Sequence, residues 1–183
     1  MHPKCIVLIG FKHVGKSVIG GKLAQQLNLP FVDLDRVIES VFANRLKNRK
    51  LIDVGYRQIM QVHGQDYFRT LEKQALTQVL NDNSAVIALG GGTLIDTENQ
   101  AMVKNHRVVH ITADQDTVFA RIMRQGQPAF FSSDIPPRES FNQLWNERDP
   151  IYKKLAHFTI ENNDLIEKSV KELALQLTEL GVL

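Results

Sequence analysis

Short, almost continuous apolar runs alternate along this chain with longer stretches that have helical spacing. Longer amphipathic segments separate or follow the runs. The clearest spans 166–180, where apolar residues fall three or four apart before Gly181. The pattern predicts an α/β fold, a three-layer α/β/α arrangement around a five-stranded parallel sheet. The five predicted strands are 5–9, 31–33, 85–89, 107–111 and 157–160.

Composition favours one domain and small partners. With 183 residues and 43% hydrophobic content, residues 1–183 are predicted to form a single domain around one core. The formal net charge is only +2 and no Lys/Arg run is dense, which argues against a nucleic-acid or membrane partner. The single cysteine, Cys5, and the lack of an export signal or membrane span indicate a cytoplasmic protein, with a monomer as the default state.

The strongest chemical signal follows the first apolar run. There GFKHVGKS, from Gly10 to Ser17, satisfies the pattern G-x-x-x-x-G-K-[ST], and 18–27 has the spacing of a helix. Such a loop directs backbone N–H groups and a helix N-terminus at phosphates. Lys16 is predicted to neutralise the β- and γ-phosphates of ATP, and the Ser17 hydroxyl to bind Mg²⁺. An ordinary glycine-rich turn is the alternative, which the strand–loop–helix context disfavours.

Two carboxylates stand at the end of the second predicted strand. Asp33 and Asp35 are two residues apart in FVDLD, so an extended strand would turn both toward the same side. Asp33 is a candidate magnesium ligand through water, and Asp35 a candidate base for the proton of an attacking hydroxyl. Either could instead cap the following helix, because Asp is a favoured N-cap residue.

Three further features lie downstream. Arg69 and Glu72 are adjacent on a predicted helix, where the arginine suits bidentate capture of a carboxylate and the glutamate could hold its guanidinium. A surface ion pair has the same spacing. Glycines 90–92 end a predicted central strand, where backbone can approach a ligand, and a flexible turn is the alternative. Arg148, in RDPIY, resembles an ordinary surface residue when taken alone.

Taken in order, GFKHVGKS, DLD, FRTLE, GGG and RDPIY resemble the motifs of shikimate kinases, over residues 6 to about 160. The resemblance implies a nucleoside-monophosphate-kinase-like P-loop fold with strand order 2-3-1-4-5, a substrate-binding region at about 36–70 and a lid at about 121–138. It also implies ATP-dependent phosphorylation of the 3-hydroxyl of shikimate in aromatic amino-acid biosynthesis, with ATP and Mg²⁺ as cofactors.

The same resemblance implies roles for individual positions. Asp35 would hold the shikimate hydroxyls and act as the base, Arg69 and Arg148 would clamp the carboxylate, and Glu72 would support the site. Gly91 would donate its backbone N–H, within a substrate-binding set that includes Gly90, Gly91 and Gly92. The metal would lie at Ser17 and Asp33, and ATP would contact His13, Val14, Gly15, Lys16, Ser17, Val18 and Arg124.

Two departures from the family pattern concern the lid and the acceptor region. Gln127 stands where the family usually has an arginine before proline, so the lid would bring less positive charge to the transferring group. A polar segment at 44–50 has the character of an insertion near the acceptor. The lid sequence PAF and Trp145 resemble the kinase domain of pentafunctional aromatic-pathway enzymes. Candidate replacements for the lid arginine are Arg121, Arg124 and Arg138.

Two alternatives stay open at this point. A different small-molecule P-loop kinase, of the gluconate type, would share the phosphate loop and differ in its acceptor pocket. A degenerate protein that binds ATP without phosphorylating a metabolite would explain Gln127. It would not explain why the catalytic and metal-binding candidates are all present: Lys16, Ser17, Asp33 and Asp35.

Overall fold

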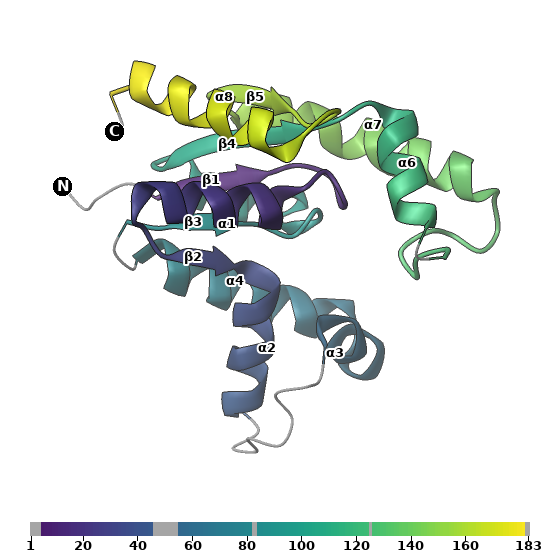
Figure 1. Cartoon of the computed structure of the whole chain (residues 1–183). Coiled ribbons are helices and arrows are strands. Elements are labelled where there is room, and N and C mark those ends of the chain that lie inside the picture. The colour runs from purple at the N-terminus through teal and green to yellow at the C-terminus, as the bar shows by residue number, and fades with distance from the viewer. Residues whose placement is uncertain (1–4, 46–54, 82–83, 125, 182–183) are drawn as a thin grey trace.

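A five-stranded parallel sheet forms the centre of the computed structural model, which describes residues 5–45, 55–81, 84–124 and 126–181 (Figure 1). The strand order is β2-β3-β1-β4-β5, so the first strand of the chain lies in the middle. The predicted fold class and strand order are confirmed, and strand ends differ from the prediction by no more than a residue. The strands are β1 (Ile6–Ile9), β2 (Phe31–Asp33), β3 (Val86–Ala88), β4 (Arg107–Thr112) and β5 (Phe158–Glu161).

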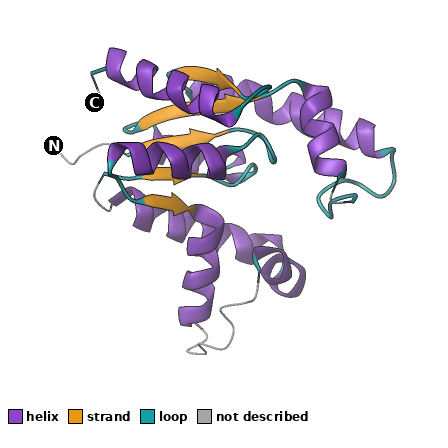
Figure 2. Cartoon of the chain, viewed as in Figure 1, coloured by secondary structure: helices purple, strands orange, loops and turns teal. Residues whose placement is uncertain are grey.

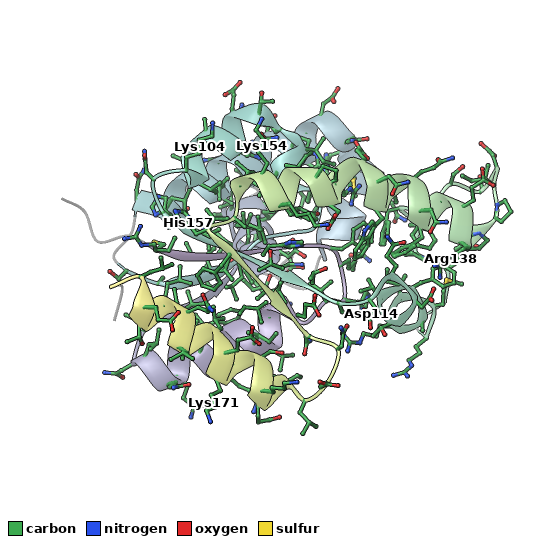
Figure 3. The ribbon with its side chains drawn as sticks, turned by 90° about the horizontal axis from the view of Figure 1, so that it is seen from above. Lys104, Asp114, Arg138, Lys154, His157 and Lys171 are labelled. Atoms are coloured by element: carbon green, nitrogen blue, oxygen red, sulfur yellow. The ribbon has the colours of Figure 1, made fainter. Side chains whose placement is uncertain are left out.

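Helices cover both faces of the sheet, and Figure 2 shows them on either side of the strands. Helices α1 (Lys16–Leu27) and α8 (Ile166–Glu179) lie side by side on one face. The other face carries α4 (Gln65–Asn81), α5 (Thr97–Val103) and α7 (Pro137–Leu155), as the view from above shows (Figure 3). None of the described helices combines the length and the apolar character that crossing a membrane requires.

The burial of β1 explains why its residues are apolar without alternation. Ile6 pairs with Val86 on one side and with Arg107 on the other, and all four residues of β1 are buried between the two helical layers. At the other end of the chain, α8 buries Val170 and Leu173, and Gly181 follows it with a φ of 65°. The predicted amphipathic helix and its glycine stop are therefore confirmed.

Two segments extend beyond the layers at the carboxyl ends of the strands. The predicted substrate-binding region corresponds to α2 (Leu34–Arg45), α3 (Tyr56–His63) and the start of α4, which pack on one another. The predicted lid comprises the end of α6 (Gln115–Met123), a loop at 126–136 and the start of α7. Of the segment at 44–50 that has the character of an insertion, residues 46–50 lie outside the described residues, as does Gln125.

Candidate active site

The loop between β1 and α1 has the backbone conformation that its glycines permit. Gly10 has a φ of 138°, and a Cβ there would lie 2.1 Å from the carbonyl oxygen of Ile111, so no larger residue fits. The Lys16 ammonium folds back onto this loop, donating hydrogen bonds to the carbonyl oxygens of Gly10 at 2.9 Å and Phe11 at 2.7 Å. Burial lowers the pKa of Lys16 to about 8, so it stays mainly protonated at neutral pH.

Asn162, at the end of β5, fixes the middle of the same loop. Its side chain is buried, and Nδ2 donates to the carbonyl oxygen of Val14 at 2.9 Å. Ser169 on α8 donates its hydroxyl to the Asn162 Oδ1 at 3.3 Å. Val14 is fully buried within the loop, and its carbonyl accepts a hydrogen bond from a residue 148 positions later in the sequence.

A cavity of about 490 Å³ opens at the carboxyl edge of the sheet, beside the phosphate loop. Its walls come from the loop itself, the end of β2, the start of α4, the residues that follow β3, the lid and α7. This edge is where ligands bind in open parallel α/β sheets. The predicted residues that line the cavity are His13, Gly15, Lys16, Ser17, Val18, Asp33, Asp35, Arg69, Glu72, Gly90, Gly91, Gly92 and Arg148.

Ser17 and Asp33 are in direct contact at the rim of this cavity. The Ser17 hydroxyl donates to the Asp33 Oδ2 at 2.7 Å. Both groups offer oxygen ligands, and Mg²⁺ in nucleotide sites takes one or two protein oxygens and fills its other positions with water and phosphate oxygens. The donor set therefore fits the predicted metal.

Asp35 reaches the cavity by a different route from the one predicted. Strand β2 ends at Asp33 and α2 begins at Leu34, so the expectation that an extended strand aligns the two carboxylates is wrong. The helix starts early because Asp33 caps it, accepting the backbone N–H of Asp35 at 3.1 Å on Oδ1. The capping alternative therefore holds for Asp33, whose other oxygen contacts Ser17.

Asp35 has the electrostatics of a base that works near neutral pH. Burial and the neighbouring charge of Asp33 raise its pKa to about 6, while the cationic Lys16 and Lys12 act in the opposite direction. At pH 7 the carboxylate is mainly ionised and still a stronger base than an exposed aspartate. A general base gains efficiency when its pKa lies close to the working pH.

Arg69 and Glu72 form a partly buried ion pair at the acceptor end of the cavity. Arg69 Nη1 donates to Glu72 Oε2 at 2.5 Å and to the Gly92 carbonyl oxygen at 3.2 Å. Glu72 is 2% exposed, and its second oxygen accepts the Thr93 hydroxyl at 2.8 Å. A simple surface ion pair is therefore excluded, because the glutamate is buried and orients the guanidinium.

Each of the three glycines after β3 lies against a different wall of the site. A Cβ on Gly90 would lie 3.1 Å from Asp35 Oδ1, one on Gly91 would lie 3.2 Å from the Lys12 backbone nitrogen, and one on Gly92 would lie 3.0 Å from an Arg69 nitrogen. Side chains at these positions would displace the acceptor residues or the phosphate loop. Close approach, rather than a flexible turn, accounts for the run of glycines.

Arg148 enters the cavity from α7, the helix that precedes β5. Its guanidinium lies over the Phe11 ring at 5.7 Å, and its Nη1 is 3.5 Å from the Gly91 carbonyl oxygen. Arg148 Nε is buried and has no hydrogen-bond partner among the described residues. Trp145, one turn earlier, packs on the same Phe11 ring at 5.4 Å. The side chain is therefore a positioned cation and not an ordinary surface residue.

Two predicted ATP contacts lie outside the lining. Val14 is a loop residue whose side chain is buried in the core, and Arg124 is exposed at the end of α6. The other candidate replacements for a lid arginine are also engaged away from the cavity. Arg121 donates to the Asn162 carbonyl oxygen at 3.0 Å. Arg138, at the start of α7, forms an ion pair at 2.6 Å with Asp116 on α6 (Figure 3).

Sequence reasoning missed six residues that line the cavity: Lys12, Met60, Phe68, Ala88, Leu89 and Phe130. Ala88 and Leu89 belong to the apolar run predicted as the third strand. Lys12 occupies one of the variable positions of the phosphate-loop motif, which specifies no residue type there. Met60 and Phe68 follow ordinary helical spacing, so nothing distinguishes them from core residues. Phe130 stands in the predicted lid, where an aromatic side chain is not distinguished by the motif from an ordinary packing residue.

The fold and the site together define a P-loop kinase of small molecules. The family model described as shikimate kinase matches residues 12–178. The chain belongs to the shikimate kinase family. The reaction that defines this family is the ATP-dependent phosphorylation of shikimate, in aromatic amino-acid biosynthesis.

Individual relatives agree with this assignment. Shikimate kinase 1 of Salmonella newport (strain SL254) is 33% identical over 175 residues, which cover 95% of each chain. A shikimate kinase from Acinetobacter baumannii, solved in complex with shikimate, has a TM-score of 0.79 and 27% identity, covering 96% of this chain and 94% of its own. A gluconokinase from Sinorhizobium meliloti 1021 has a TM-score of 0.61 at 13% identity, covering 97% and 93%, and shares the fold alone. The gluconate-type alternative is therefore not favoured.

Proposed function

We propose that this chain transfers the γ-phosphoryl group of ATP to the 3-hydroxyl of shikimate, with the residues of the cavity in the roles below. One observation carries the proposal. Arg69 from α4 and Arg148 from α7 line the same cavity as Asp35 and Lys16, so carboxylate recognition, a base and phosphate binding converge. Their elements lie on different parts of the fold, and a shared ligand accounts for their meeting.

The phosphates of ATP would lie on the loop of Gly10–Ser17 and the N-terminus of α1. Lys16 would leave the two loop carbonyls that it now contacts and bind the β- and γ-phosphates. Ser17 and Asp33 would hold Mg²⁺, which supplies charge neutralisation on the phosphates when bound. His13 and Val18 line the same end of the cavity and would contact the nucleotide.

The acceptor would lie at the other end of the cavity. Arg69 and Arg148 would bind its carboxylate, Glu72 would keep Arg69 oriented, and the backbone N–H of Gly91 would donate to it. Asp35 would orient the 3-hydroxyl and remove its proton as the oxygen attacks. Positioning of this kind supplies much of the rate enhancement in phosphoryl transfer, since little covalent chemistry is left to the protein.

The loop at 126–136 would close over the nucleotide and exclude water. Phe130, from this loop, already lies at the cavity wall. Exclusion of water prevents hydrolysis of ATP in place of transfer. A monomer located in the cytoplasm is the expected state of the enzyme.

A coupled ADP-release assay with shikimate, gluconate and quinate tests the function. We expect turnover that depends on shikimate and is weak or absent with gluconate. Arg69→Ala and Arg148→Ala should each raise the KM for shikimate by about 10- to 100-fold, because a charge-assisted hydrogen bond to a carboxylate is worth about 1.5–3 kcal/mol. ATP binding without acceptor-dependent turnover would refute the proposal in favour of a degenerate nucleotide-binding protein.

A further inference from the structure

Lys12, at a variable position of the phosphate loop, lies close to two other walls of the cavity. These are the glycine loop after β3 and the lid. Lys12 lines the cavity and is half-buried. Its backbone nitrogen lies against Gly91, where a Cβ on the glycine would be only 3.2 Å away. Its ammonium lies 5.5 Å from the centre of the Phe130 ring, which belongs to the lid. Lys12 is therefore placed where the lid meets the phosphate loop.

The lid loop itself brings no cation to this place. Residues 126–136 contain no lysine and no arginine. The arginines at its two ends point to other partners: Arg121 is bonded to the Asn162 carbonyl oxygen, and Arg138 is paired with Asp116 and lies over the Phe119 ring at 5.0 Å. Arg124 is exposed and does not line the cavity.

The other cations of the described cavity wall have their own positions. Lys16 lies on the carbonyls of the loop, Arg69 is bonded to Glu72 and Gly92, and Arg148 is stacked on Phe11 at the acceptor end. The positive charge of Lys12 is close enough to affect both Asp35 and Lys16 electrostatically. Burial is the largest influence on both pKa values, and the Lys12 ammonium lowers the pKa of both Asp35 and Lys16.

We propose that Lys12 is a catalytic residue whose ammonium binds the transferring phosphoryl group, supplying from the phosphate loop the cation that the lid lacks. The inference rests on the proposed function. Negative charge on the transferring group is stabilised in phosphoryl-transfer enzymes by a cation additional to the P-loop lysine, which can come from the same chain or from a partner. The Phe130 ring would hold the ammonium over the phosphates when the lid closes, through the cation–π contact already present.

Replacement of Lys12 by methionine tests the proposal, because methionine keeps the apolar stem and removes the charge. We expect kcat with shikimate to fall on the order of 100-fold, with the shikimate KM changed by less than about threefold, since the lost contact forms in the transition state. Lys12→Arg should retain kcat within about tenfold, because the charge remains. A loss of kcat smaller than about fivefold in Lys12→Met would overturn the proposal.

Lys22→Met is the matched control. Lys22 lies on α1, outside the cavity lining, in an exposed ion pair with Glu167 at 3.1 Å. Exposed pairs contribute little to stability, so this variant should keep the wild-type kcat. Thermal unfolding of each variant tests the fold: if Lys12→Met melts within a few degrees of the wild type, its lower kcat is not due to unfolding.

A double variant separates charge supply from a structural role. If Lys12 and an arginine at position 127 bind the same phosphoryl group, each can replace the other. Gln127→Arg should then raise kcat by a factor at least about tenfold larger in the Lys12→Met background than in the wild type. Equal factors in both backgrounds would mean independent contributions and would contradict the proposal. Phe130→Leu should reduce kcat less than Lys12→Met, and equal losses would show that Lys12 only fastens the lid.

The activity of the wild type distinguishes a failure of the proposed function from a failure of the proposed role of Lys12. Absence of shikimate-dependent ADP release in the wild type would refute the proposed function. Normal wild-type turnover combined with full activity of Lys12→Met would refute only the role of Lys12.

Discussion

The hydroxyl of Tyr152, on α7, donates a hydrogen bond to the carbonyl oxygen of Gly91, in the loop after β3. Tyr152 is 3% exposed, and its ring packs on the buried His110 ring at 5.3 Å. Burial raises the pKa of the phenol, which therefore stays neutral and keeps its proton as a donor. The contact ties the helix that carries Arg148 to the glycine that faces the phosphate loop.

Tyr152→Phe should loosen this connection while leaving the ring in place. The Gly91 carbonyl would lose its main donor, which should reduce the free energy of unfolding by about 1–2 kcal/mol. The KM for shikimate should rise more than kcat falls, because Arg148 and Gly91 would shift relative to each other. Urea unfolding and steady-state kinetics measure the two effects.

Tyr67→Phe is the control for this variant. Tyr67 packs against Phe42 and His63 through its ring and lies outside the cavity lining. Loss of its hydroxyl should change neither property appreciably. Similar effects from both substitutions would show that the Tyr152 hydroxyl has no special position.

Asp35→Asn should abolish most turnover and stabilise the fold. Loss of the base should reduce kcat by about 10²- to 10⁴-fold. The pKa of Asp35 is raised from 3.8 to about 6 in the folded state, so ionisation is easier in the unfolded chain and the charged carboxylate destabilises the fold as pH rises through this interval. At pH 7.5 the variant should therefore gain on the order of 1–3 kcal/mol in unfolding free energy.

Denaturant titrations at two pH values check the sign of this effect. The gain should be full at pH 7.5, well above the folded-state pKa of about 6, and should shrink as pH falls toward 4. An equal gain at pH 7.5 and near pH 4 would contradict the attribution of this gain to ionisation of Asp35. Near pH 4 the aspartate is protonated in the folded state, so little charge is left to remove.

The acid limb of the pH–rate profile should report the same carboxyl group. If Asp35 must be ionised, kcat/KM should fall tenfold per pH unit below about 6. The charges that act on it are Asp33 and Glu72, which raise its pKa, and Lys16 and Lys12, which lower it. Lys12→Met should therefore move the limb to higher pH. A limb near pH 4 in the wild type would show that Asp35 is not the group that titrates.

Glu72→Gln should weaken acceptor binding without affecting the nucleotide. The amide oxygen can still accept the Thr93 hydroxyl, but the Arg69 guanidinium loses its charged partner inside a half-buried site. We expect the KM for shikimate to rise about tenfold and the KM for ATP to stay within about twofold, since the ion pair orients the carboxylate clamp alone. Equal changes in both constants, measured with each substrate varied in turn, would argue for a general loss of structure.

The sequence was sufficient where local patterns decide the structure. Continuous apolar runs located the strands, and the motif from Gly10 to Ser17 located the phosphate loop, because both depend on neighbouring residues. Strand geometry predicts an extended backbone at Asp35, but the residue is helical, because Asp33 caps α2 and the helix begins at Leu34. The prediction that Asp35 lies in the site is right, and the prediction that an extended strand places it there is wrong.

Contacts between distant loops could not be predicted in this way. The approach of Lys12 to Phe130 depends on how the lid folds over the phosphate loop, and no spacing rule relates the two segments. The bond from Tyr152 to Gly91 joins residues 61 positions apart and depends on the register of α7 against the sheet. Such contacts follow from packing of whole elements, which periodicity within one element does not specify.

The bond between Asn162 and Val14 spans 148 positions of sequence, and this has a consequence for the order of events during synthesis. The loop that receives the phosphates leaves the ribosome well before the side chain that fixes its middle, because Asn162 follows Val14 by 148 residues. A nascent chain that ends before β5 holds the complete nucleotide motif without the strand that shapes it. Tight ATP binding should therefore appear only after Asn162 has been synthesised, so that the nucleotide stabilises chains that contain β5 and not shorter ones.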